Sequence, residues 1–203
     1  MLTLLEPKVS VGFHGREALM GEFESTSAIY AVVPEFTNNP IAWGTFKEVP
    51  DTFFYLCVFR TFSEDLPEPS EFCASLAQLH LSSASPNEKF GFHVVTYNGD
   101  LPQENGYVDT WEACFTNGLK HMININLIRA GDSELQELES AMCEKVIPRI
   151  LRPLEINGRS VKPSLVHGDL WCGNTAMDMD IDKPVIFDPC CFYAHNECVH
   201  KTF

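Results

Sequence analysis

The sequence predicts an α+β protein with two parts that differ in secondary structure. Residues 41–46 and 53–59 are apolar runs rich in aromatic and β-branched side chains, as is typical of strands. Beyond the acidic, Pro-rich segment 63–69, apolar residues recur mainly at helical spacing. Because the composition changes there, we predict a domain boundary, with residues 1–62 forming one lobe and residues 63–203 the other.

In the first lobe we expect a helix over residues 16–33, where apolar side chains recur at helical spacing until Pro34 ends the run. The run 53–59 shows no polar alternation, so we expect a strand covered on both faces. Residues 5–7, Leu-Glu-Pro, do not resemble a strand, and none is predicted ahead of the helix.

In the second lobe we expect three helices followed by a β-pair. The helices begin at Ser70, at the capping box of residues 109–112 and at Ser133. Residues 90–105 are punctuated by Gly and Pro, so we predict irregular structure there. Short apolar runs at 165–166 and 185–187 are predicted to be strands that flank a turn at residues 178–184.

The most informative stretch is VHGDLWCGN at residues 166–174, followed by VIFDP at residues 185–189. In phosphoryl transfer by eukaryotic-type kinases, one Asp receives the substrate hydroxyl, while an Asn and a second Asp hold Mg²⁺. The interval from Asp169 to Asn174 equals that of the protein-kinase catalytic loop, and Asp188 ends the next apolar run. The pattern predicts that Asp169 is the catalytic base and that Asn174 and Asp188 are the metal ligands for Mg²⁺.

Each of these residues also has a structural interpretation. Asp169 and Asn174 each follow a glycine, so either side chain could simply stabilise a turn. An acid at the end of a buried strand, such as Asp188, requires a partner because an unpaired buried charge is costly. The register of the three residues together favours the kinase interpretation.

Further motifs extend the pattern over most of the chain. They are GEFE (21–24), PIAWG (40–44), LAQLH (76–80), FGF (90–92), LPQEN (101–105) and FYAHNE (192–197). Together with HGDLWCGN and FDP, these motifs resemble the fructosamine/ketosamine-3-kinases, which include protein-ribulosamine 3-kinases, over roughly residues 8–197. This family is part of the aminoglycoside-phosphotransferase branch of the protein-kinase-like superfamily. The resemblance implies a bilobal protein-kinase-like fold, ATP and Mg²⁺ as cofactors, and phosphorylation of the 3-hydroxyl of protein-bound ribulosamine or fructosamine, which helps to reverse glycation.

The resemblance also assigns three residues outside the acidic motif. Lys8 matches the lysine that contacts the nucleotide phosphates, and Glu22 on the following helix would pair with it. Trp171 would form an aromatic wall against the sugar of a ketosamine substrate. The structural alternatives are a surface lysine for Lys8, a solvated helix residue for Glu22 and core packing for Trp171.

Several other polar residues and cysteines have structural or undecided assignments. We expect His167 to brace its loop through a backbone hydrogen bond. Gln103 and Asn105 either meet the substrate or stitch a loop together, and both alternatives stay open. Residues 190–200 gather three Cys and two His, which suggests zinc, but their spacing favours small structural residues. Four more cysteines lie in apolar segments, where a thiol behaves as a small hydrophobe: Cys57, Cys73, Cys114 and Cys143.

The chain departs from the family at both ends. Seven residues precede Lys8, and the sequence lacks the glycine-rich hairpin that covers the nucleotide phosphates in such kinases. After Glu197 the family continues through several helices, whereas this chain stops at Phe203. We therefore expect a partial N-lobe with a truncated sheet and a C-lobe whose helical part is truncated. The alternatives to an active ketosamine kinase are an impaired remnant that acts as a binding protein or has no function, and another small-molecule kinase on this fold.

The composition excludes some classes of partner. The net charge of −14 disfavours nucleic acid, because phosphate backbones bind clusters of Lys and Arg. No apolar run approaches the ~20 residues that span a bilayer, and the N-terminus lacks the basic region of a signal peptide. We therefore expect a cytoplasmic protein with reduced thiols, whose partners are glycated proteins or small ketosamines. The sequence does not indicate an oligomeric state.

Overall fold

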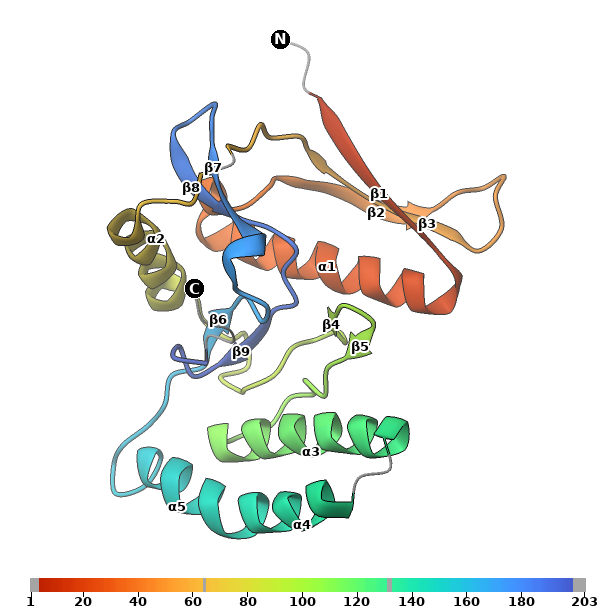
Figure 1. Ribbon diagram of the computed structural model, residues 1–203. Helices are drawn as coiled ribbons and strands as arrows, with labels where there is room; N and C mark the ends of the chain where they lie inside the picture. Colours follow the sequence, from red (N-terminus) through yellow and green to blue (C-terminus); the bar gives the residue numbers. More distant parts are fainter. Residues whose placement is uncertain (1–3, 64, 131–132, 199–203) are drawn as a thin grey trace.

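The computed structural model describes residues 4–63, 65–130 and 133–198, which form an upper part built on a sheet and a lower part built on helices (Figure 1). The upper part is a three-stranded antiparallel sheet, in the order β1-β3-β2, packed against one long helix. Its elements are β1 (Leu5–Val11), α1 (Gly12–Val32), β2 (Pro40–Thr45) and β3 (Thr52–Val58). The helix and the two strands predicted for the first lobe are confirmed.

Strand β1, which carries Lys8, is absent from the sequence prediction. It pairs with β3 along its whole length, so that Lys8 lies opposite Tyr55. Pro7 obscures the strand in the sequence, since proline cannot donate a hydrogen bond to a sheet. Within the described residues β1 has a neighbouring strand on one side only, and such an edge strand tolerates a missing N–H.

The prediction that β3 is covered on both faces is wrong. Its buried residues alternate with half-buried ones, which is the pattern of a sheet with one covered face. Tyr55 and Cys57 are buried and pack with Leu19 of α1. On the other face Phe54 is half-buried and packs against Phe46, with 5.3 Å between the ring centroids. The apolar run of β3 therefore includes side chains on a face that is only half-buried.

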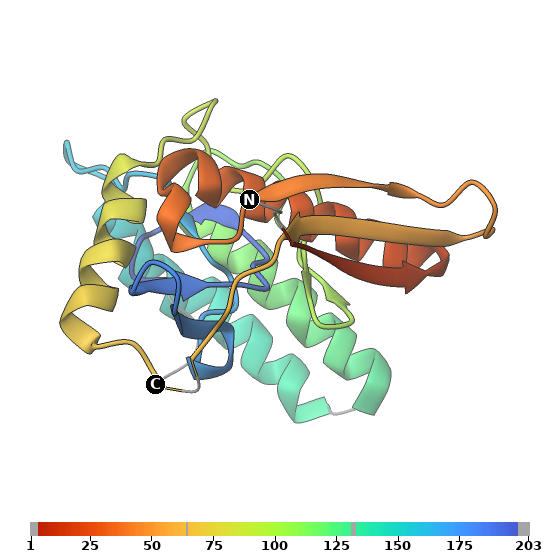
Figure 2. The ribbon, with the colours of Figure 1, turned by 90° about the horizontal axis from the view of Figure 1, so that it is seen from above.

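The rest of the described chain, called the lower part, contains the remaining helices and three short strand pairs. Its helices are α2 (Pro69–Ser82), α3 (Trp111–Ala130), α4 (Ser133–Ala141), a π-helical segment (Met142–Val146) and α5 (Ile147–Leu151). Its strand pairs are β4 (Tyr97–Asn98) with β5 (Leu101–Pro102), β6 (Ser164–Val166) with β9 (Phe192–Ala194), and β7 (Thr175–Asp178) with β8 (Lys183–Ile186). Helices α3, α4 and α5 lie at the bottom of Figure 1, whereas β7 and β8 lie at the height of the three-stranded sheet. Helices α3 and α4 run side by side in both ribbon views (Figures 1 and 2).

The three helices predicted for this part are confirmed, but the strand prediction needs a correction. We predict that the run at 165–166, now β6, flanks the turn before β8, but β7 is the strand that does so and pairs with β8. Strand β6 pairs instead with β9, which follows Asp188. Strands β7 and β9 are too short to give a periodic signal in the sequence. No helix in the described ranges is both long and apolar enough to cross a bilayer.

Two helices begin with capping residues that differ from the prediction. At α2 the carboxylate of Glu68 accepts hydrogen bonds from the backbone N–H groups of residues 70 (2.9 Å) and 71 (3.1 Å). Ser70 lies inside the helix, because a proline occupies the first helical position. At α3 the hydroxyl of Thr110 accepts from the N–H of residue 113 (3.2 Å), and the carboxylate of Glu155 accepts from the N–H groups of residues 111 (2.9 Å) and 112 (3.3 Å). Glu112 of the predicted capping box is instead bound to Arg152 (2.6 Å).

One hydrophobic core extends from the upper part into the lower part. It combines Ile29 of α1 with Leu79 of α2 and with Leu165 and Val166 of β6. Because these buried residues come from both sides of segment 63–69, the division into lobes at that segment stays a prediction. Of the four cysteines expected to act as small hydrophobes, Cys57 and Cys114 are buried, Cys143 is half-buried and Cys73 is exposed, which corrects the expectation for Cys73.

A buried ion pair holds the segment that follows β3 in contact with β7. Arg60 Nη1 donates a hydrogen bond to Asp178 Oδ2 (2.9 Å). The guanidinium also donates to the backbone carbonyls of Glu35 (3.0 Å) and Pro34 (3.2 Å). The side chain of Asp178 is only 3% exposed, so removal of the arginine would leave a buried charge without its partner.

We expect Arg60→Ala to lower the free energy of unfolding by about 3–5 kcal/mol, because it leaves the buried carboxylate of Asp178 without its cationic partner. Urea denaturation would measure this loss. Arg149→Ala, which removes an exposed arginine from α5, is the control and should change stability by less than about 0.5 kcal/mol. An equal loss of unfolding free energy in the two variants would contradict the stabilising role of the Arg60–Asp178 pair.

Candidate active site

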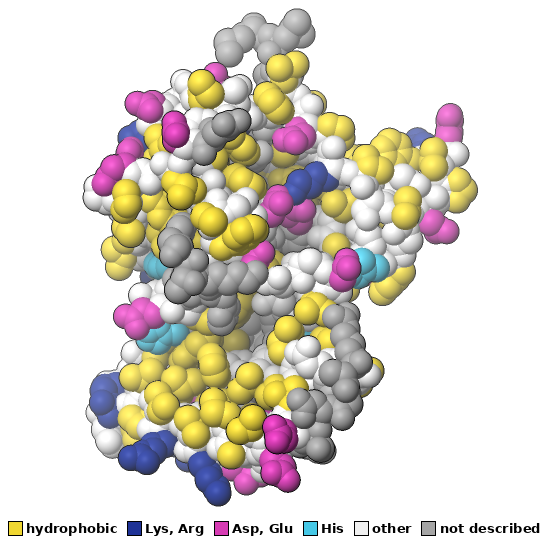
Figure 3. All heavy atoms as spheres, in the orientation of Figure 1, with side chains coloured by type: hydrophobic (Ala, Val, Ile, Leu, Met, Phe, Trp, Pro, Cys, Tyr) yellow, Lys and Arg dark blue, Asp and Glu magenta, His cyan; other side chains and the backbone are white. Residues whose placement is uncertain are grey.

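A lysine and two acids from three separate segments meet between the upper and lower parts. Lys8 Nζ on β1 donates hydrogen bonds to Glu22 Oε1 on α1 (2.6 Å) and to Asp188 Oδ1, which follows β8. Basic and acidic side chains lie side by side in the middle of the face shown in Figure 3. The predicted pairing of Lys8 with Glu22 is confirmed, and the contact with Asp188 connects the sheet to the acidic motif.

Burial and charge act in opposite directions on this cluster. Burial lowers the pKa of the Lys8 ammonium, but the carboxylates of Glu22 and Asp188 outweigh it, so the pKa is raised. Burial raises the pKa of Glu22, and the charge of Lys8 only partly opposes this effect. Lys8 is therefore a fixed cation at neutral pH, and it can bind an anionic group in a protein whose net charge is −14.

The loop that carries Asp169 is fixed by its backbone neighbours. Gly168 has a φ of 86°, and a Cβ at this position would collide with the carbonyl oxygen of Cys190. The buried ring of His167 donates from Nε2 to the carbonyl oxygen of Phe187 (2.9 Å) and accepts at Nδ1 from the backbone N–H of Asp169 (3.3 Å). The predicted bracing role of His167 is confirmed, and the imidazole joins the two acidic segments.

Two amide side chains hold the Asp169 carboxylate. Asn174 Nδ2 donates to the backbone carbonyl oxygen of Asp169 (2.8 Å) and to its Oδ2 (3.3 Å). This orientation leaves Asn174 Oδ1 as the atom that can bind a cation. Asn98 Nδ2 on the β4–β5 hairpin donates to Asp169 Oδ1 (3.2 Å). Asn98 is not among the site residues predicted from the sequence, where its only signal is the Asn98-Gly99 pair typical of hairpin turns.

Asp188 has a left-handed backbone conformation, with a φ of 55°. This region is uncommon for residues other than glycine, and it persists where neighbouring contacts impose it. Here the N–H of Phe187 donates to the carbonyl of Asn174 (3.2 Å), and the N–H of Cys190 donates to the carbonyl of His167 (2.9 Å). The side chain of Asp188 is 52% exposed, so the strained turn presents its carboxylate toward Lys8 and solvent.

Two cavities flank the cluster and share Glu22 and Asp188 as lining residues. The larger, of about 300 Å³, is also lined by Tyr97 of the β4–β5 hairpin and by three residues that follow β6, namely Asp169, Trp171 and Asn174. The smaller, of about 240 Å³, lies beside Lys8 and the buried face of β3. Each predicted site residue lines at least one of these cavities: Lys8, Glu22, Asp169, Trp171, Asn174 and Asp188.

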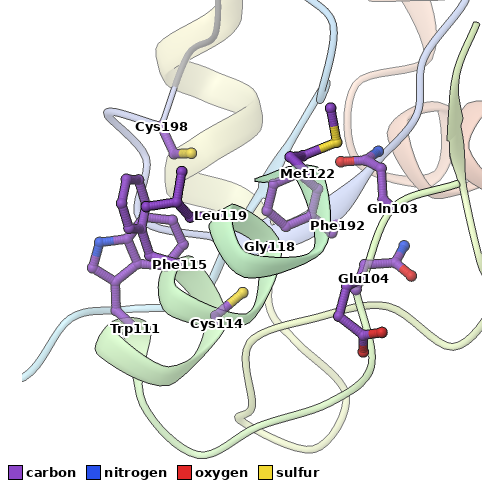
Figure 4. A pocket seen from close by; sticks show the side chains of 11 residues that line it. Gln103, Glu104, Trp111, Cys114, Phe115, Gly118, Leu119, Met122, Phe192 and Cys198 are labelled. Atoms are coloured by element: carbon purple, nitrogen blue, oxygen red, sulfur yellow. The ribbon is translucent and has the colours of Figure 1, made fainter. Parts of the chain in front are cut away.

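A third cavity, of about 210 Å³, shares no lining residue with the other two (Figure 4). Its walls are mainly apolar side chains of α3, including Phe115, Leu119 and Met122, together with Phe192 of β9. An apolar lining does not suit a phosphorylated ligand. The candidate active site is therefore the region where the charged residues converge.

The structure separates the alternatives left open for three more residues. Trp171 is 40% exposed on the wall of the 300 Å³ cavity, so it is not a core residue, and its contact with substrate stays a prediction. Gln103 Nε2 donates to the carbonyl of Cys190 (2.8 Å), and Asn105 Nδ2 donates to Thr96 Oγ1 (2.8 Å). Both amides therefore stitch the loop together.

The cysteines of the tail pack into the core. Cys190 and Cys191 are buried, and the N–H of Cys191 donates to Ser25 Oγ of α1 (2.9 Å). This bond attaches α1 directly to the segment that follows Asp188. The described part of the chain contains no group of three or more His, Cys, Asp and Glu placed to hold a metal, and residues 199–203, which include one histidine of the tail, lie outside it.

Burial gives His167 a testable effect on stability. It lowers the pKa of this imidazole from 6.5 to about 4, so the unfolded chain binds the proton more readily than the folded chain. We expect the free energy of unfolding to fall by about 3 kcal/mol on this account as the pH drops from 6.5 to 4. Denaturant titrations across this range would show a shallower pH dependence in His167→Gln, whereas His14→Gln, at an exposed site, should follow the wild type. Coincident curves for wild type and His167→Gln would exclude the effect.

Known proteins that are similar in sequence to this chain are named as kinases of ketosamines or ribulosamines. A sequence model of the family described as Fructosamine kinase matches residues 14–199. A ketosamine-3-kinase of Mus musculus is 41% identical over 111 residues, or 54% of this chain and 33% of the mouse protein. A chloroplastic protein-ribulosamine 3-kinase of Arabidopsis thaliana is 29% identical over 179 residues, or 87% of this chain and 52% of the plant protein. The chain thus spans between a third and about half of the length of these curated relatives.

Solved structures show the fold. A putative fructosamine-3-kinase from Haemophilus somnus 129PT superimposes with a TM-score of 0.70 at 20% identity, covering 96% of this chain and 61% of that one. The aminoglycoside phosphotransferase APH(4)-Ia superimposes with a TM-score of 0.52 at 12% identity, covering 95% and 61%. The predicted protein-kinase-like α+β fold is confirmed. Since the family model matches nearly the whole sequence, the chain belongs to the fructosamine kinase family.

Proposed function

We propose that this chain carries a phosphoryl-transfer site that uses Mg·ATP to phosphorylate the 3-hydroxyl of ribulosamine or fructosamine on protein lysines. One observation carries the proposal: Lys8 bridges Glu22 and Asp188, while Asp169 and Asn174 line the cavity that Asp188 also lines. A cation, a candidate base and two oxygen ligands are the groups that kinases use for this reaction. The names of the relatives support ketosamines as the acceptor class.

The donor set suits Mg²⁺, which prefers hard oxygen ligands and binds few protein carboxylates. Asn174 Oδ1 and the half-exposed carboxylate of Asp188 would hold the ion, and the ion would neutralise charge on the phosphates. Lys8 would bind a phosphate oxygen, and Glu22 would keep the ammonium in place. The raised pKa of Lys8 supports this role because it preserves the positive charge.

Asp169 is the proposed general base. Its carboxylate would accept the proton of the acceptor hydroxyl as that oxygen bonds to the γ-phosphorus and the bond to the β-phosphate breaks, releasing ADP. The acceptor would enter the 300 Å³ cavity, where Tyr97 and Trp171 offer aromatic surface to a sugar. The carboxylates around this cavity favour an acceptor with a protonated amine, as in a ketosamine, over an anionic one.

Several parts of the proposal concern the whole protein. We propose deglycation of proteins as its role and the cytoplasm as its location. The proposed acceptor is ribulosamine or fructosamine, with the choice between them left open. The plant relatives are named as chloroplastic proteins, so fractionation of cells that express the chain would test the location separately. Nucleic acid and membranes are not among the proposed partners.

The test is transfer from Mg·ATP to a synthetic ribulosamine by the full 203-residue chain. We expect a 3-phosphorylated product, and Asp169→Asn should lower the rate by a factor of about 10²–10⁴, the range that a general base contributes. Product formed equally by the variant would contradict the role of Asp169. Binding of Mg·ADP without any product would indicate a nucleotide-binding protein instead of an enzyme.

A second test addresses the metal ligands without relying on turnover. We expect Asp188→Asn to weaken the binding of Mg·ADP by about 10- to 100-fold, because it replaces a charged oxygen ligand with a neutral one. Isothermal titration calorimetry with and without Mg²⁺ would measure the change. Asp180→Asn, in the exposed turn between β7 and β8, is the matched control and should bind like the wild type. A metal-independent affinity in the wild type would oppose the assignment.

A further inference from the structure

The β4–β5 hairpin lies between α1 and α3 and faces the proposed catalytic loop (Figure 1). Its residues Tyr97 and Gly99 line the same 300 Å³ cavity as Asp169. Asn98, between them, directs its side chain to Asp169, 71 positions away in the sequence, with 3.2 Å between Asn98 Nδ2 and Asp169 Oδ1. A hairpin Asn that served only its turn would bond to local backbone instead.

The contact places one amide on each oxygen of the carboxylate. Asn98 donates to Oδ1 and Asn174 donates to Oδ2, at 3.3 Å. The two amides come from different elements, the hairpin and the 3-10 turn Cys172–Asn174. A carboxylate that accepts a hydrogen bond at each oxygen is restricted in its orientation. An amide donor also orients the base without adding the positive charge that would weaken it as a proton acceptor.

The hairpin itself is well fixed, so it can present Asn98 at a constant position. Gln103 Nε2 donates to the carbonyl of Cys190 (2.8 Å) and to Thr96 Oγ1 (3.0 Å). The N–H of Gln103 donates to the carbonyl of Thr96 (2.9 Å), which closes the base of the hairpin. On its other side α1 approaches closely, since a Cβ on Gly21 would lie 2.8 Å from the carbonyl oxygen of Val95.

We propose that Asn98 is a positioning residue for the proposed general base: its amide fixes the Asp169 carboxylate toward the acceptor hydroxyl. The inference rests on the proposed function for its kinetic consequence, although the contact between the two residues is independent of it. Because the hairpin also lines the acceptor cavity, it would orient the base and contact the acceptor at the same time.

The kinetic test compares Asn98→Ala and Asn98→Asp with the wild type. We expect Asn98→Ala to lower kcat about tenfold with an unchanged KM for ATP, because a general base depends on its alignment. In Asn98→Asp a second carboxylate faces the base, so the acidic limb of the profile of kcat/KM against pH should move upward by about one unit. Asp100→Ala, an exposed change in the same hairpin, should keep the kcat and the pH profile of the wild type. A normal kcat and pH profile in both Asn98 variants would overturn the proposal.

An independent measurement separates this proposal from the proposed function. The ¹³C resonance of the Asp169 carboxylate, assigned through its loss in Asp169→Asn, should shift in Asn98→Ala and stay in place in Asp100→Ala. This readout requires no turnover. If the wild type transfers no phosphate, the proposed function fails, and the resonance still decides whether Asn98 holds Asp169. An unchanged resonance in Asn98→Ala would overturn the positioning role even in an active enzyme.

Discussion

The bridge from Lys8 to Glu22 and Asp188 is the interaction on which the arrangement of the site depends. Each partner comes from a different segment: an edge strand, the long helix, and the turn after β8. The bridge acts together with the shared core and with the bond from Cys191 N–H to Ser25 Oγ, and it supplies the positive charge that offsets the repulsion between the two carboxylates. In an acidic protein this one ammonium therefore has a structural role, and under the proposed function the same charge would also bind a phosphate group.

Neutral backbone contacts hold the acids where the bridge needs them. The ring of His167 bonds to both acidic segments, and Gly168 allows Cys190 to approach where no side chain would fit. The strained φ of Asp188 is imposed by these neighbours and not by its own preference. The hydrogen bonds of the imidazole and of the backbone thus help the bridge from Lys8 to hold the two acidic segments together.

The sequence predicts the residues of this site that lie close together along the chain, but it does not predict those that only the pairing of distant segments brings into the site. The order Asp169, Asn174, Asp188 is legible because one loop and one turn fix their mutual geometry. The strand that carries Lys8 is hidden because Pro7 breaks the strand pattern and its partner, β3, lies far along the chain. Asn98 is invisible as a site residue because only the folded hairpin brings it to Asp169. The cap of α2 is predicted at Ser70 and lies at Glu68, because serine is among the preferred capping residues whereas glutamate is not.

The hydrogen bond from Cys191 N–H to Ser25 Oγ has a consequence for regulation. In many kinases the helix that carries the glutamate paired with the lysine swings outward to switch the enzyme off, which separates the two side chains. Here the same movement would also leave a buried amide without an acceptor, a loss of about 2 kcal/mol that corresponds to a roughly 30-fold preference for the inward position. The contact therefore favours one position of α1 relative to the segment that follows Asp188, and we expect these two segments to move together.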